Sequence, residues 1–157
     1  YKFDIRYFAV IIVKNSSIEI EHIPYAMIRL CSKKFSFDTN DVHSNLTNTS
    51  INKDNKCTIS ICKYDEKWKK SFIDMEIITN DFFKNTIKEI GEKSFHRINE
   101  NSIASTRIIG FDFIISENDE MFILESNYSP GDNTYYGSEC KQKVIEYYAE
   151  NIIKKIL

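Results

Sequence analysis

The sequence has no apolar run long enough to cross a membrane and no excess of either charge. Its longest apolar run, residues 8–13 (FAVIIV), is far shorter than the ~20 residues that a transmembrane helix needs. The net charge is −2, from 21 basic and 23 acidic residues, so there is no electrostatic footprint for nucleic acid or an anionic membrane. No signal-peptide pattern opens the chain. We therefore expect neither nucleic acid nor a membrane as a partner, and we expect a cytoplasmic protein.

Cysteines are few, and their spacing does not suit a metal. Of the four, only Cys57 and Cys62 are close together, five residues apart, whereas a structural zinc site usually needs two close pairs. Two disulfides are formally possible, but free thiols of a cytosolic protein are the simpler interpretation. Glycine and proline are also rare, with 4 and 2 residues. The hydrophobic fraction of 42% over 157 residues is sufficient for one folded domain.

Alternating and β-branched segments predict strands along much of the chain. The expected strands are residues 2–13, 18–23, 25–30, 107–115 and 120–127. Pro24 is expected to separate two of them, because proline cannot donate to a sheet. Residues 33–56 are polar and too long for an ordinary connection, which is typical of functional or disordered loops. Residues 57–77 are ambiguous.

Two helices are expected in the second half of the chain. The first begins with Thr79 or Asn80 as its N-cap and places Phe83, Ile87 and Ile90 on one side. The second runs from about residue 138 to residue 157. Along one stripe of this helix we expect Lys141, Ile145, Tyr148, Ile152 and Ile156. Together these elements predict an α+β fold, an antiparallel sheet covered by helices.

The last two predicted strands form a hairpin with a turn at residues 116–119, and this hairpin carries a group of oxygen ligands. Asp112 is expected opposite Glu125 or one residue away, and Asn127 shares the face of Glu125. The expected core-facing side chains are Phe111, Phe113, Phe122 and Leu124. Two carboxylates and an amide suit Mg²⁺, which keeps water or phosphate oxygens in its other positions. The alternative is the solvated face of an edge hairpin, and spacing alone favours it.

Four segments resemble the tubulin–tyrosine-ligase-like family, in that family's order and at about its spacing. They are residues 2–6 (KFDIR), 45–53 (NLTNTSINK), 110–113 (GFDF) and 124–130 (LESNYSP). The resemblance implies an ATP-grasp fold and an ATP- and Mg²⁺-dependent ligase that activates a carboxylate as an acyl phosphate. The amine of a free amino acid then attacks, giving an amide bond. The family's N-terminal and central subdomains would precede Tyr1, so residues 1–157 would be the C-terminal part of such a domain, inactive alone.

The resemblance also implies roles for individual residues. Asp112, Glu125 and Asn127 would bind the Mg²⁺ ions that bridge the ATP phosphates. Arg6 matches a position associated with substrate carboxylates, and Arg29 one that stabilises the phosphoryl or acyl-phosphate group. The positions matching nucleotide contacts are Lys2, Asp4, Thr47 and Asn48. Without the resemblance, the same residues could be a sheet ion pair, a surface arginine and a simple turn.

Three departures from the family pattern leave every proposed metal ligand in place. Asn45 stands where the family has His, Thr49 replaces an aromatic residue, and Ser126 replaces Val in a strand position expected to face the core. Residues 50–53 (SINK) resemble the glutamate-adding members more than the tyrosine-adding one. The expected partners are therefore a free amino acid, with glutamate favoured, and tubulin or another protein with an acidic tail. The expected location is the cytoplasm, at microtubules or cilia. The alternatives are an ATP-grasp ligase with a non-tubulin acceptor and an inactive remnant that serves as a binding module.

Overall fold

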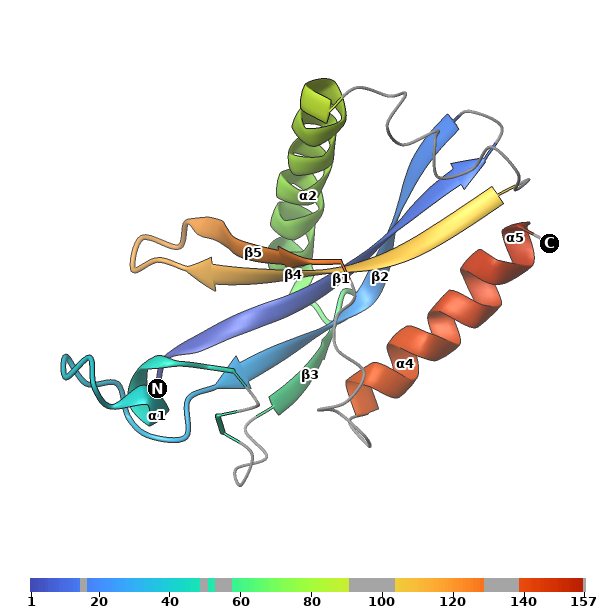
Figure 1. The fold of residues 1–157 in the computed structure, drawn as a ribbon. Coiled ribbons are helices and arrows are strands. Elements are labelled where there is room, and N and C mark those ends of the chain that lie inside the picture. The colour runs from blue at the N-terminus through green and yellow to red at the C-terminus, as the bar shows by residue number, and fades with distance from the viewer. Residues whose placement is uncertain (15–16, 49–50, 53–57, 91–103, 129–138, 157) are drawn as a thin grey trace.

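A five-stranded antiparallel sheet with helices on both faces forms the fold (Figure 1). The structure, a computed structural model, describes the chain except residues 15–16, 49–50, 53–57, 91–103, 129–138 and 157. The strands are β1 (Phe3–Lys14), β2 (Ser17–Leu30), β3 (Thr58–Cys62), β4 (Ala104–Ile115) and β5 (Met121–Asn127), in the order β3-β2-β1-β4-β5. The helices are α1 (Val42–Asn45), α2 (Lys69–Ile90), α4 (Glu139–Tyr147), a π-helical segment (Tyr148–Ile153) and α5 (Lys154–Ile156). The α+β class and the antiparallel sheet are thus confirmed.

The two faces of the sheet have separate cores, because side chains alternate along each strand. On one face, Tyr7 and Phe111 pack against α2. On the other face, Val10 and Met27 pack against α4 and the π-helical segment, including Val144. The even-numbered residues of β1 share the face of Val10, and they include Asp4 and Arg6, which are buried as well. The polar cluster described below therefore lies on the sheet face that the C-terminal helices cover only in part.

Strand β2 is continuous through Pro24, so the expected break between two strands is wrong. The pairing of β1 with β2 is irregular at this point, with Tyr7 opposite Ala26 and Ala9 opposite His22. The irregularity accommodates the proline, since a residue outside the regular ladder needs no amide hydrogen there.

Helix α2 begins ten residues before the expected start. Thr79 is fully buried in its middle, not an N-cap, and Asn80 bonds the ring of His22. The apolar stripe of this helix starts with Phe72 and Met75, which pack on the sheet and extend the helix upstream. Phe83 is buried as expected, whereas the side chain of Ile90 lies outside the described residues.

The C-terminal helix is present, and its expected stripe is confirmed in part: Tyr148, Ile152 and Ile156 belong to or pack against the second core, whereas Ile145 does not. Ile145 is 51% exposed, whereas Cys140 and Val144 are buried. The π-helical segment follows, and within it Ile152 is buried against the sheet as expected. None of the helices in the described part of the chain is both long and apolar enough to span a membrane.

Candidate functional site

A cavity of about 180 Å³ lies where β1 begins and β2 ends, beside the hairpin of β4 and β5. Seven of the nine residues expected at the site line it, namely Lys2, Asp4, Arg29, Thr47, Asn48, Asp112 and Glu125. The other two are bonded to lining residues: Arg6 to Asp112, and Asn127 to Glu125. The fold therefore brings together segments that are over 100 residues apart in the sequence.

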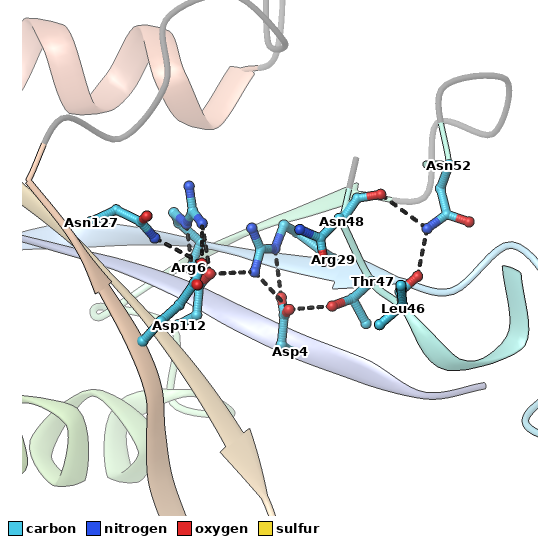
Figure 2. A network of polar contacts seen from close by, with 10 residues as sticks. Asp4, Arg6, Arg29, Leu46, Thr47, Asn48, Asn52, Asp112 and Asn127 are labelled. Carbon is cyan, nitrogen blue, oxygen red and sulfur yellow. Dashed lines mark hydrogen bonds and ion pairs between the residues drawn. The ribbon is translucent and has the colours of Figure 1, made fainter. Parts of the chain in front are cut away.

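Two arginines and two aspartates form the buried floor of this site (Figure 2). Arg6 donates from Nε and Nη2 to the two oxygens of Asp112, at 2.5 and 2.6 Å. Arg29 donates in the same two-pronged way to Asp4, with both distances 2.6 Å. Its Nη2 also lies 2.8 Å from Oδ2 of Asp112, which joins the two pairs into one network. Such forked contacts fix the orientation of both guanidinium groups.

The register of the sheet explains this network. Asp4 stands opposite Arg29 across β1 and β2, and Arg6 stands opposite Asp112 across β1 and β4. Directly opposed side chains on one face lie within bonding reach, so opposite charges at these positions pair. The alternative interpretation, an ion pair between Asp4 and Arg6 themselves, is wrong, because each pairs with a residue on a neighbouring strand.

Two buried members of the network, Asp112 and Arg29, are stabilised in their charged forms by their partners. Burial favours the neutral form of Asp112, but hydrogen bonds from Arg6 and the charge of Arg29 outweigh it, so the pKa of Asp112 lies below its usual value. Burial likewise opposes the charge on Arg29, yet its bonds with Asp4 and the nearby Asp112 raise the pKa of Arg29. The floor of the cavity therefore holds the charges of Arg29 and Asp112 in fixed positions.

A β-bulge in the hairpin aims the remaining acidic side chain at the cavity. Asp112 is paired with Glu125, as expected, but Phe113 is paired with Ile123, so Leu124 is an extra residue. Glu125 and Leu124 consequently both line the cavity. Asn127 donates from Nδ2 to Oε1 of Glu125 at 2.9 Å.

The same bulge makes part of the expected core assignment wrong. Phe111 and Phe113 are buried, but Phe122 and Leu124 are 51% and 57% exposed. Because the bulge reverses the alternation within β5, Met121 and Ile123 pack against the core in their place. Ser126, expected to face the core, is exposed.

Residues 46–48, in the loop that follows α1, form another wall of the cavity. The hydroxyl of Thr47 donates to Oδ2 of Asp4, and Thr47 is buried. Asn52 holds this loop through its side-chain amide, which donates to the backbone oxygens of Leu46 and Asn48. Asn52 belongs to the family-like segment of residues 45–53, but the sequence did not indicate a role for it. In the sequence, Asn52 is one of several amide side chains in this segment, and an amide side chain does not by itself indicate which groups it binds.

The oxygen atoms of the hairpin suit a hard cation that takes part of its ligands from elsewhere. A carboxylate has about four acceptor positions; Asp112 uses three of them for Arg6 and Arg29. The side chain of Glu125 is 56% exposed and lies 3.7 Å from Arg6, which leaves it accessible. Within the described residues, no three His, Cys, Asp or Glu side chains are grouped to hold a metal by themselves. Asp112, Glu125 and the amide of Asn127 thus fit Mg²⁺ only with water or phosphate completing its shell.

A larger cavity, of about 270 Å³, lies elsewhere and has a different character. It lies between β1, β4 and α2, and its lining is mainly apolar, with Ile11, Phe82 and Ile109 among the lining residues. None of the nine expected site residues contributes to it. The smaller cavity is therefore the candidate site, because catalysis and ligand orientation need the charged and polar groups found there.

Comparison with known proteins agrees with the motifs. A family model described as the tubulin-tyrosine ligase family matches residues 1–154, which includes every residue of the site. Among curated proteins, none matches the chain. The family match supports an enzyme of the ligase type, of the tubulin-tyrosine-ligase kind. With nearly its whole length matched, the chain belongs to the tubulin-tyrosine ligase family.

Proposed function

We propose that the protein is an ATP- and Mg²⁺-dependent ligase that forms an amide bond between an amino acid and a carboxylate of a protein. One observation carries the proposal: Arg29, the hairpin carboxylates and Thr47 line one cavity, and Arg6 is bonded to the lining residue Asp112. Glutamate is the favoured amino acid, and tubulin or another protein with an acidic tail is the favoured acceptor. The chain would then act as the C-terminal part of an ATP-grasp domain, in the cytoplasm and at microtubules or cilia.

In this reaction the γ-phosphoryl group of ATP passes to the acceptor carboxylate, giving ADP and an acyl phosphate. The amine then attacks the acyl carbon, the amide bond forms, and phosphate leaves. Mg²⁺, when bound, neutralises charge on the phosphate oxygens and orients them. The residues that would hold it are Asp112, Glu125 and Asn127, through the oxygens described above.

The arginines supply fixed positive charge for anionic groups in the same cavity. Arg29 bonds Asp4 and Asp112 through Nε and Nη2, so Nη1 is the nitrogen that can meet a phosphoryl oxygen. Arg6 is held by Asp112 and can face a substrate carboxylate. Preoriented charges of this kind stabilise developing negative charge without reorganising during the reaction.

The nucleotide contacts would come from the two walls of the cavity. Lys2 and Asn48 line it and are available to a ligand. Asp4 differs from Lys2 and Asn48, because it already accepts two bonds from Arg29 and one from Thr47, which leaves at most about one acceptor position for a ligand. We therefore propose that Asp4 supports the site chiefly by holding Arg29 and Thr47.

The test is Mg²⁺-dependent ATP binding by calorimetry on the full-length protein. Glu125→Gln keeps the shape of the side chain but removes its charge, so we expect Mg²⁺-dependent binding to weaken at least tenfold with little change in stability. The matched control is Glu117→Gln, an exposed residue in the turn of the same hairpin, which should bind as wild type does. Binding that is equal in both variants would rule out Glu125 as a metal ligand.

Two alternatives would emerge from the same experiment and its continuation. If wild type binds no nucleotide under any Mg²⁺ condition, the protein is a remnant that acts as a binding module. If it binds ATP, ligation assays with glutamate, glycine and tyrosine on tubulin and on a non-tubulin acidic protein identify the acceptor class. The charged network favours the enzyme, since a binding module has no need to bury two arginines with two aspartates.

A further inference from the structure

We propose that Asn52 is a positioning residue, which holds Thr47 and Asn48 in place as one wall of the ligand cavity. This proposal rests on the function proposed above, since the value of a fixed wall depends on a ligand that meets it. Asn52 itself does not line the cavity. Its effect would be exerted through the two residues that do.

Asn52 is 5% exposed and uses both ends of its amide. Figure 2 shows the donor end, which points to the backbone oxygens of Leu46 and Asn48. Nδ2 donates to the backbone oxygen of Leu46 at 2.7 Å and to that of Asn48 at 3.1 Å. Oδ1 accepts from the backbone N–H of Ser32 at 3.2 Å. The two carbonyls that it binds flank Thr47 on either side, so the amide spans the residue whose hydroxyl reaches Asp4.

The third bond connects this loop to the strands that carry the charged network. Ser32 follows Cys31, whose N–H donates to the backbone oxygen of Lys2 at 2.9 Å. Arg29 lies three residues before Ser32, at the end of β2. Asn52 thus joins the loop to the position where β1 begins and β2 ends, which is the base of the cavity.

Only an amide satisfies these partners, because they comprise two acceptors and one donor. Asn52→Ala leaves two carbonyls and one N–H without a side-chain partner. Asn52→Asp keeps an acceptor for Ser32 but places negative charge against the carbonyls of Leu46 and Asn48. Both substitutions should loosen the backbone on either side of Thr47. Asn52→Asp should loosen it more than Asn52→Ala does if the bonds from Nδ2 contribute most of the stabilisation.

The experiment uses the full-length protein and three measurements. Hydrogen exchange of the peptide covering residues 46–52 reports the loop without any ligand, and calorimetry reports Mg²⁺-dependent ATP binding. The third is a double-mutant cycle on ATP binding with Thr47→Val. The control is Asn151→Ala, which removes one amide-to-carbonyl bond, to Tyr147 in the C-terminal helix, away from the cavity.

We expect Asn52→Ala to exchange faster in residues 46–52 and to bind ATP about tenfold more weakly, with the loss much smaller in the Thr47→Val background. The control should change neither. Unchanged exchange, or a loss that is equal in both backgrounds, would overturn the proposal. If wild type bound no ATP, the proposed function would fail, and exchange alone would decide whether Asn52 fixes this loop.

Discussion

Replacing Arg29 with methionine removes a buried guanidinium and keeps a side chain of similar length. Arg29 is 3% exposed and serves two acids, with bonds of 2.6 Å to Asp4 and a contact of 2.8 Å to Asp112. In the variant, Asp112 keeps Arg6, but Asp4 keeps only the hydroxyl of Thr47. Removing one member of a buried ion pair typically costs about 3–5 kcal/mol, because the partner charge stays buried. We therefore expect the free energy of unfolding to fall by that amount.

Such a loss is large against the total stability of a domain, which is about 5–15 kcal/mol. Urea unfolding measures it, and the single tryptophan, Trp68, provides a fluorescence signal because it packs against the core beneath α2. Arg107→Met is the matched control, since Arg107 is exposed and its guanidinium lies 5.4 Å from the ring of Tyr128. We expect it to cost less than about 1 kcal/mol. Equal, small losses in both variants would refute the claim that the two aspartates depend on Arg29.

The acid dependence of stability gives an independent check on the same network. Because the pKa of Asp112 is lowered on folding, its ionised form stabilises the fold above the unfolded pKa, and this contribution is lost as the pH falls through the folded value. Arg29 is one cause of the lowering, so Arg29→Met should leave a smaller contribution to lose. Stability measured between about pH 5 and pH 2 should then fall less steeply in the variant than in wild type.

Three further variants test the α2 face and the hairpin. Burial lowers the pKa of His22, so the neutral ring contributes its full stabilisation above about pH 6.5. This contribution is lost as the pH falls below that value. His22→Gln retains a polar group for Tyr7 and Asn80, so the thermal midpoint of this variant should decline less between pH 7 and pH 5 than that of wild type. Phe111→Ala should lower the free energy of unfolding, measured in urea, by about 3–5 kcal/mol because the ring is fully buried. Phe122 is half exposed, so Phe122→Ala should lower it far less. Similar losses in the two variants would contradict the bulged register of the hairpin.

Periodicity was sufficient to predict the sheet and the presence of both helices. The strands alternate clearly, and the turn at residues 116–119 lies between two such strands as expected. It was not sufficient for the start of α2, because the segment around Ile77 and Thr79 is β-branched and is helical only through its packing on the sheet. The short strand β3, in the segment left ambiguous, likewise forms through pairing with β2.

The candidate site was predicted mainly through the motifs, which identified the residues but not their pairing. Asp4 and Arg6 are two residues apart on one predicted strand, so alternation alone is sufficient to place them on the same face, where both are buried. Their partners depend on how β1 aligns with β2 and β4, which are segments distant in sequence. Local patterns contain no information about that alignment, since register is set by the turns and by the packing of whole faces.

One extra residue in β5 determines how the core and the site share the hairpin. In regular alternation, Glu125 would follow Ile123 and Met121 toward the α2 face, where these two pack against the core. The bulge at Leu124 shifts the alternation by one residue, so that Glu125 points to the opposite face from Ile123 and stands opposite Asp112 at the cavity. A carboxylate on the apolar face would be expensive to bury, and an apolar residue opposite Asp112 would remove the candidate metal ligand. The irregularity in the ladder is therefore what allows one short strand to close the core with its first half and to present acidic and amide oxygens with its second.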